Sequence, residues 1–220
     1  MPVNPPDPVR YPRRADRARR THQALVTAAA ELIAEAGYAA TTIEALAQRA
    51  GVARATVFTS APGGKPQLLK EARDQAIAGD DEPVPIPQRS WFIDAMAQAD
   101  PRELLRRQAA NYRRILERAA RLERTLATAA ATDQALAGLH AEARRQRHFG
   151  AAFVAGRLAE LDALADQESA ADTIYALCGP DVYLLLVEES GWTPLQYEAW
   201  MADALERLVP RSSGTRKEPR

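Results

Sequence analysis

Residues 41–65 read TTIEALAQRAGVARATVFTSAPGGK, which predicts two short helices joined by a glycine-centred turn. Thr41 and Glu44, three residues apart, have the spacing of a capping box that would start the first helix. Gly51 can adopt the left-handed backbone conformation that would end it. The second helix, residues 54–59, is too short to bury much surface. We therefore expect a helix-turn-helix whose second helix reads DNA.

The composition is that of a soluble globular protein with one large or two modest domains, since 46% of the 220 residues are hydrophobic and 26% are charged. Apolar runs fall well short of the roughly 20 residues that cross a bilayer, and the N-terminus has prolines and arginines in place of a signal peptide. These features predict a cytoplasmic protein without membrane contact. The single cysteine, Cys178, excludes an intramolecular disulfide, and we expect no metal and no cofactor.

The net charge of zero hides an uneven distribution. Residues 1–70 hold ten basic and five acidic side chains, a net charge of +5, which leaves −5 for the remainder. A cluster of arginines lies just before and at the start of the first predicted helix: Arg10, Arg13, Arg14, Arg17, Arg19 and Arg20. Such a cluster can be a solvated tail or an arm that follows DNA phosphates or enters the minor groove. Beside a helix-turn-helix, the second interpretation is favoured.

The positions of glycines, prolines and helix-capping residues predict an all-α protein with two domains. A first helix over residues 16–36 would be ended by Gly37, and three prolines within residues 79–88 indicate a domain boundary. In the second half, helix starts are predicted at Asp100, Asp133 and Thr193, and near Gln167, with a break at residues 179–180. The expected organisation is a disordered basic arm (1–15), a helix-turn-helix domain with a connecting helix (16–79), a linker (80–90), a helical body (91–210) and a disordered tail (211–220).

The chain resembles the TetR family of bacterial transcriptional regulators. The resemblance is specific over residues 19–69 and extends more loosely to residue 209. Residues 79–91 and 179–205 also look like a subgroup of TetR-like regulators common in actinobacterial genomes. The residues that match the family pattern are Ala28, Ala29, Leu32, Glu35, Gly37, Thr41, Thr42, Leu46, Ala47, Ala50, Gly51, Val52, Thr56, Val57, Lys65 and Leu68.

The resemblance implies a DNA-binding set. Arg54 is the expected base reader, because a guanidinium can donate two hydrogen bonds to guanine. Thr42 and Lys65 would anchor phosphates, and His22 is expected to face solvent or DNA. The predicted DNA-binding residues are Arg17, Arg19, Arg20, Thr42, Arg54, Ala55, Thr56, Phe58, Thr59 and Lys65.

Several positions depart from the family pattern. Ala53 stands where a capping serine is usual, and Phe58 stands where a tyrosine is usual. Ser60 and Ala61 replace a His-Phe pair, and residues 63–64 lengthen the following loop by one glycine. These changes predict a less rigid reading head with weaker phosphate contacts.

The body is expected to supply an effector pocket and a dimer interface. The predicted pocket residues are Trp91, Phe92, Met96, Tyr112, Phe149, Phe153, Tyr175 and Tyr183, each of which could equally be ordinary core. The family's four-helix interface points to residues 173–187 and 197–208. In the last helix, the predicted contacts are Tyr197, Trp200, Met201, Ala204, Leu205 and Leu208, with intramolecular core as the alternative.

Together these features predict a homodimeric repressor that binds palindromic double-stranded DNA and is released by a small apolar or aromatic effector. Two alternatives stay open: an architectural DNA binder without an effector, and a TetR-like ligand- or protein-binding module with weakened DNA binding. An enzyme is not expected, because no nucleophile motif or phosphate-binding glycine loop is present. His140 and His148 are also about 12 Å apart along one predicted helix, too far to share a metal.

Overall fold

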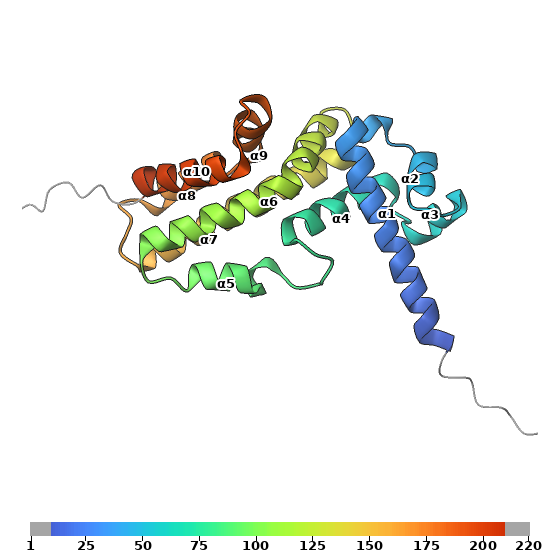
Figure 1. Cartoon of the computed structure of the whole chain (residues 1–220), viewed down its shortest axis with the longest axis horizontal. Coiled ribbons are helices and arrows are strands. Elements are labelled where there is room, and N and C mark those ends of the chain that lie inside the picture. Colours follow the sequence, from blue (N-terminus) through green and yellow to red (C-terminus); the bar gives the residue numbers. More distant parts are fainter. Residues whose placement is uncertain (1–9, 210–220) are drawn as a thin grey trace, which may run out of the picture.

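The structure, a computed structural model, describes residues 10–209 and the side chains from residue 14 onward. In that part of the chain ten α-helices and no strand are found (Figure 1). The prediction of an all-α fold is therefore confirmed.

The first four helices form the head at one end of the molecule (Figure 1). Gly51, with φ 66°, turns the chain between the second and third helices, as predicted. Leu25, Leu46 and Val57 come from different helices of the head and are fully buried in one core. The head consists of α1 (Arg10–Ala40), α2 (Ile43–Arg49), α3 (Arg54–Ser60) and α4 (Gly64–Ala78).

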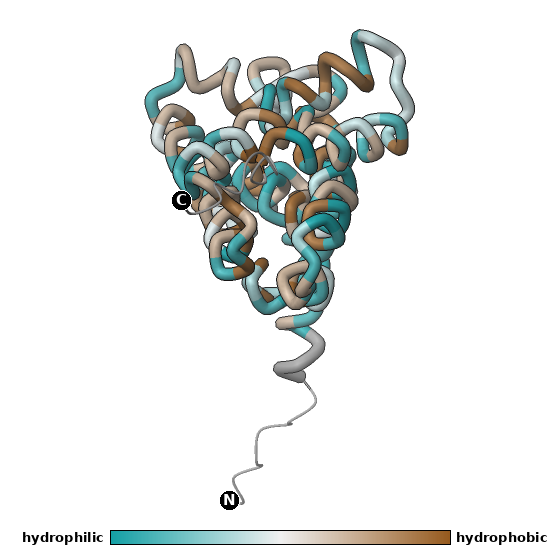
Figure 2. Tube along the Cα trace, turned by 90° about the vertical axis from the view of Figure 1, so that its left-hand side faces the viewer, coloured by the Kyte–Doolittle hydropathy of each residue, from teal (hydrophilic) through white to brown (hydrophobic). Residues whose placement is uncertain are grey.

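The first helix begins at Arg10 and not at the predicted residue 16. Residues 10–15, assigned to an extended arm by the sequence, are therefore helical, while residues 1–9 lie outside the described part. Gly37 (φ 82°, ψ 167°) interrupts the helix at the predicted place, and a short turn follows to Ala40. Figures 1 and 2 show this end of α1 projecting from the head.

The body is a bundle of six further α-helices. The predicted helix starts are confirmed, since the side chains of Asp100, Asp133 and Thr193 all cap helix N-termini. Thr193 also forms a complete capping box with Gln196. The body helices are α5 (Ser90–Met96), α6 (Pro101–Ala130), α7 (Gln134–Glu160), α8 (Gln167–Leu177), α9 (Pro180–Tyr183) and α10 (Pro194–Leu208).

Two structural elements of the body are not predicted from the sequence. The proline-rich linker carries a short 3-10 helix, η1 (Ile86–Gln88), followed directly by α5. Beyond α9 the chain continues as a stretch of π-helix, η2 (Leu184–Glu189). The predicted break at residues 179–180 is confirmed, because Pro180 starts a new helix at that point.

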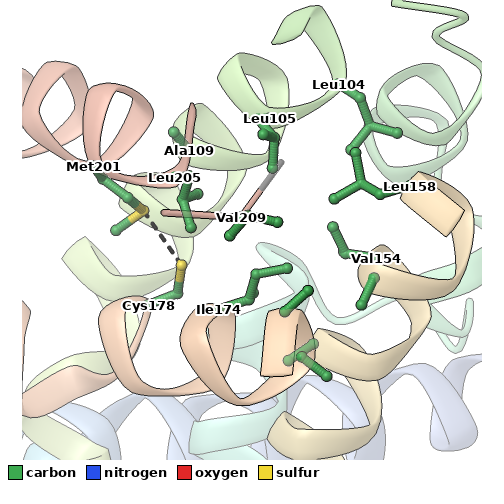
Figure 3. Close-up of a cluster of buried hydrophobic side chains, with 14 of the residues drawn as sticks. Leu104, Leu105, Ala109, Val154, Leu158, Ile174, Cys178, Met201, Leu205 and Val209 are labelled. Atoms are coloured by element: carbon green, nitrogen blue, oxygen red, sulfur yellow. Dashed lines mark hydrogen bonds between the residues drawn. The ribbon is translucent and has the colours of Figure 1, made fainter. Parts of the chain in front are cut away.

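The body core lies where α6, α7, α8 and α10 meet. Figure 3 shows Met201 and Leu205 of α10 pointing towards Ala109 of α6 and Cys178. The thiol of Cys178 lies 3.6 Å from the sulfur of Met201, and burial raises the pKa of that thiol. Cys178 is therefore a packed and unreactive side chain.

Head and body are joined by packing as well as by the chain. Leu122 and Leu126 of α6, and Leu136 of α7, belong to the core of the head. In contrast, Leu104 and Leu105, at the other end of α6, belong to the core of the body. The long helix α6 therefore connects the two cores rigidly.

No single helix in the described part is long and apolar enough to cross a membrane. One pair, α8 with the α9–η2 segment, has a sufficient length and composition but is bent by 43°. Ile174 and Leu184 of this pair are buried in the body core.

Candidate nucleic-acid interface and adjoining cavity

The predicted reading helix α3 is exposed along one side. Its N-terminus has no side-chain cap at Ala53, as predicted. Phe58 keeps 52% of its surface exposed, an unusually high fraction for an aromatic ring, while Val57 is fully buried and holds the helix to the head. Ala55 and Thr59 are exposed and Thr56 is partly exposed, so α3 presents the predicted residues outward.

Arg54 projects from the first turn of α3 and forms an ion pair with Glu44 of α2. The distance between Arg54 Nε and Glu44 Oε1 is 2.9 Å, and both side chains are largely exposed. The guanidinium also lies 5.9 Å from the centre of the Phe58 ring. Such an exposed ion pair contributes about 0–1 kcal/mol, so it can open when a stronger partner is offered.

The cap of α2 differs by one residue from the predicted one. Thr42, not Thr41, accepts a hydrogen bond from the backbone N–H of Ala45, at 3.1 Å. Thr41 is buried instead, and its hydroxyl donates to the carbonyl oxygen of Gly37 at 2.9 Å. Thr42 is exposed at the helix N-terminus, which is the position that a phosphate anchor needs.

Lys65 has a role within the head that the sequence did not reveal. Its ammonium donates to the carbonyl oxygens of Tyr38, at 2.6 Å, and Thr41, at 3.0 Å. It also lies 4.0 Å from the centre of the Tyr38 ring, and burial lowers its pKa. Lys65 therefore fastens the start of α4 to the end of α1. Its predicted contact with phosphate stays a prediction.

The basic residues of α1 lie on the projecting end of the helix. Arg14, Arg17, Arg19 and Arg20 are all exposed. Arg19 forms an exposed ion pair with Asp16 at 2.8 Å. The side chains of residues 10–13 lie outside the described part. These arginines therefore place several positive charges beside the head, and none of them is buried in its core.

The prediction that His22 faces solvent or DNA is wrong. One ring nitrogen lies 2.7 Å from the carbonyl oxygen of Ser60, and the other lies 2.6 Å from the carboxylate of Glu71. Both ring nitrogens are therefore engaged within the head. His22 therefore ties the end of α3 to α4, and the sequence hid this because the partners lie 38 and 49 residues away.

A second set of side chains that the sequence did not single out joins α2 to α1. Arg49 donates to Glu35 at 2.8 Å and to Glu31 at 2.9 Å. The hydrogen bond from Arg49 holds the pKa of Glu35 below its ordinary value. Arg49 is thus engaged within the head, unlike the arginines at the start of α1.

A cavity of about 910 Å³ is lined by residues of α4, α5, α6 and α7 and of the segment between α4 and α5. Five of the predicted pocket residues line it: Trp91, Phe92, Tyr112, Phe149 and Phe153. The Phe92 and Phe153 rings are 5.6 Å apart, and the Phe149 and Phe153 rings are 6.5 Å apart. The aromatic side chains form a nearly continuous wall from α5 to α7.

The other three predicted pocket residues lie elsewhere. The Met96 sulfur accepts a hydrogen bond from Gln108 at 3.2 Å. Tyr175 receives a hydrogen bond from Arg144, and its ring contacts Arg147 at 4.5 Å. Tyr183 is 5% exposed and packs edge-on against Tyr197 at 4.9 Å. These three residues are held by contacts within the body and are not among the residues that line the cavity.

The side of the cavity nearest the head is polar. Arg73 of α4 is buried and donates to Glu123 of α6 at 2.6 Å and to Gln146 of α7 at 3.3 Å. All three side chains line the cavity. Arg73 therefore places a buried cation of the connecting helix in direct contact with both long helices of the body.

The segment between α4 and α5 forms one edge of the cavity and is held by Arg89. This buried side chain donates to both carboxylate oxygens of Asp80, at 2.6 and 3.0 Å. It also donates to the carbonyl oxygens of Glu82 and Val84, each at 3.0 Å. The predicted linker is therefore ordered. Its residues 80–88 form a strap whose conformation is held by the four hydrogen bonds of Arg89.

The predicted dimer residues of α10 divide into two sets. Tyr197, Met201 and Leu205 are fully buried within the body, because this face of α10 packs on α6. These three side chains cannot contact a partner subunit, and their prediction as interface residues is corrected here. Trp200 and Ala204 are partly exposed and Leu208 is 61% exposed, so they stay candidates.

Residues 25–72 match the family described as bacterial regulatory proteins, tetR family. No curated protein matches this sequence. The fold is shared with a transcriptional regulator from Saccharomonospora viridis, so described and solved with choline, at a TM-score of 0.67 and 18% identity, over 90% of this chain and all of the other.

Two further solved structures have the same fold. PfmR from Thermus thermophilus, a TetR family regulator, gives a TM-score of 0.58 and 22% identity, with 86% of this chain and 96% of PfmR covered. The multidrug binding protein EbrR, complexed with imidazole, gives 0.57 and 18%, with 89% of this chain and 95% of EbrR covered.

Proposed function

The chain belongs to the TetR family of bacterial regulatory proteins, and from that premise we propose that it is a homodimeric repressor. It binds a palindromic operator through α3 and the basic end of α1, and a small apolar or aromatic effector releases it. The family's members are DNA-binding regulators and not enzymes. The proposed site of action is the bacterial cytoplasm, where the operator lies.

The observation that carries this proposal is that α4 belongs to the head and also lines the cavity. Near its start, Lys65 is bonded to the end of α1. Towards its other end, Arg73 and Ile77 line the cavity. A ligand that prefers one position of α4 would therefore change the position of the head, and by linkage the operator would change the affinity for the ligand.

The size and lining of the cavity support a small-molecule effector. Its volume of about 910 Å³ lies within the usual range of ligand sites, roughly 300–1,000 Å³. The aromatic wall suits an apolar or aromatic compound. Two proteins of this fold have been solved in complex with a small molecule, one with choline and one with imidazole. This supports a small-molecule site in the cavity of this chain.

The proposed dimer follows from the size of the head. A single α3 reads only a few base pairs, so two heads about 34–36 Å apart, one turn of DNA, would supply the specificity. The exposed side chains of η2 and α10, among them Leu185 and Leu208, are the proposed contact between subunits.

Fluorescence anisotropy with labelled DNA from upstream of the protein's own gene tests the proposal. A regulator should bind that fragment at least about 10³-fold more tightly than random DNA, with an affinity that falls steeply with salt. An architectural protein would show the salt dependence without the preference. Binding to none of the fragments at low salt would contradict both and favour a ligand- or protein-binding module.

A further inference from the structure

One face of α6 supplies the inner wall of the cavity. Gln108, Tyr112 and Leu116 follow each other at intervals of four residues, which places them on the same side of the helix. All three line the cavity. The first two carry hydrogen-bonding groups, so their partners decide what the inner end of the cavity can bind.

Tyr112 keeps its hydroxyl free for a ligand. Burial raises the pKa of this phenol far above its ordinary value, so that it is a neutral donor at physiological pH. Tyr112 lines the cavity, and its hydroxyl has no hydrogen-bond partner among the described residues. A ligand in the cavity can therefore supply that partner.

Gln108 is a buried amide with a weak partner. Its side chain is 3% exposed, and its NH₂ group donates to the thioether sulfur of Met96 at 3.2 Å. A thioether is a poor acceptor, while a buried amide normally pairs with stronger ones. Gln108 therefore has hydrogen-bonding capacity that the protein leaves unused.

The surroundings of these two groups are uncharged. Cys178 is the one titratable group in the described part whose interaction acts on the Tyr112 pKa, and burial keeps its thiol neutral. Three arginines of the lining pair with carboxylates: Arg73 with Glu123, Arg89 with Asp80 and Arg145 with Glu142. The fourth, Arg147, lies over the Tyr175 ring at 4.5 Å, and its buried Nε has no hydrogen-bond partner within the part of the chain that the structure describes. None of the four acts on the Tyr112 pKa, so an ionised ligand group beside Tyr112 would lose its water without a neighbouring counter-ion.

We propose that Tyr112 and Gln108 form a subsite for an uncharged carbonyl group of the effector, with the apolar part of the effector lying on the aromatic wall. Both side chains are donors, and a carbonyl oxygen can accept from two donors at once. The effector class is therefore a neutral aromatic ketone, ester or amide. This inference rests on the proposed role of the cavity as the effector site.

Four probes with the same two-ring skeleton test the subsite: benzophenone, diphenylmethane, diphenylacetate and benzhydrylammonium. They differ in carrying a carbonyl, no polar group, an anion or a cation. Equilibrium dialysis against the full chain gives each dissociation constant. We expect benzophenone to bind about tenfold more tightly than diphenylmethane, which corresponds to one hydrogen bond of ordinary strength, and the two ions to bind more weakly than benzophenone.

Three variants locate the effect. Tyr112→Phe and Gln108→Met should each reduce the preference for benzophenone over diphenylmethane, and Tyr112→Phe should bring it close to one. Tyr183→Phe removes the same hydroxyl from a buried tyrosine that does not line the cavity, and it should keep the preference. Thermal unfolding of all three checks that the chain is folded.

An anion or cation that binds as tightly as benzophenone would overturn the proposal. So would an unchanged preference in folded Tyr112→Phe, or failure of all four probes to bind. The proposed function fails on a different measurement, namely DNA binding. If benzophenone binds in a Tyr112-dependent way but does not release DNA, the subsite is supported. The proposed regulatory role of the cavity is then refuted.

Discussion

Arg54, the side chain assigned to reading bases, lies 2.9 Å from the carboxylate of Glu44 in the neighbouring helix. The pair is exposed, so its own contribution to stability is small, about 0–1 kcal/mol. We expect an effect of similar size on DNA binding, because Glu44 would compete with a guanine for the guanidinium and add a negative charge beside the phosphates.

Glu44→Gln is therefore expected to strengthen operator binding by a few-fold, corresponding to roughly 0.5–1 kcal/mol. Anisotropy titrations at two salt concentrations measure the change. Glu35→Gln is the matched control, since Glu35 is an exposed carboxylate paired with Arg49 on the side of α1. Weaker binding by Glu44→Gln would show instead that Glu44 orients Arg54 for the base.

Arg54→Ala should lower affinity for the operator by about 1–3 kcal/mol and relax the base preference at one position of each half-site. Binding to random DNA should change much less, since phosphates supply most of it. Competition with a library of single-base operator variants checks this. An equal loss on operator and random DNA would assign Arg54 to a phosphate.

The parts of the fold that the sequence predicted well depend on neighbours in the chain. Asp100, Asp133 and Thr193 cap their helices through groups two or three residues away, so the pattern contains the whole interaction. The break at Pro180 is equally local. The predicted cap of α2, Thr41, is one residue before the observed cap, Thr42. Thr41 is buried instead, and its burial depends on the packing of α1, which the local sequence does not reveal.

The internal contacts that the sequence could not predict depend on distant partners. Lys65 reaches a carbonyl 27 residues away, and Arg73 reaches a carboxylate 50 residues away. Both pairs form only after helices have packed. The same is true of α10. An apolar stripe such as Tyr197, Met201 and Leu205 has the same sequence pattern whether it packs on α6 or on a second subunit.

Lys65→Met separates two roles of the same ammonium. Loss of the hydrogen bonds to Tyr38 and Thr41 should destabilise the head by about 1–3 kcal/mol, because two carbonyl oxygens at the end of α1 lose a charged donor. Chemical unfolding measures this loss. If the internal role is the main one, the salt dependence of DNA binding should stay the same, whereas a phosphate contact would reduce its slope by about one.

The strap over the cavity should open when Arg89 is removed. Arg89→Met deletes four hydrogen bonds, so amide hydrogen exchange in residues 81–88 should accelerate while exchange in α6 stays slow. Arg102→Met, at an exposed position of α6, is the control. Unchanged exchange in the strap would show that its prolines alone maintain its conformation.

The same strap has a predictable response to acid. Arg89 holds the pKa of Asp80 below its ordinary value of 3.8. Since the folded state binds the proton less readily than the unfolded state, the contribution of Asp80 to stability is complete above pH 3.8 and is lost as the pH falls through the lowered pKa. Asp80→Asn should therefore flatten the decrease in strap protection over that acidic interval, as measured by hydrogen exchange.

The dimer interface can be located with charge substitutions on side chains that the body leaves exposed. Leu208 of α10 and Leu185 of η2 are 61% and 52% exposed, so Leu→Glu costs little within one subunit but would bury a charge between two. The double variant should sediment as a monomer and lose operator affinity, because each head then binds alone. Ile93→Glu, at a 49% exposed position of α5, should remain dimeric. A double variant that stays dimeric at micromolar concentration would place the interface on another face of the body.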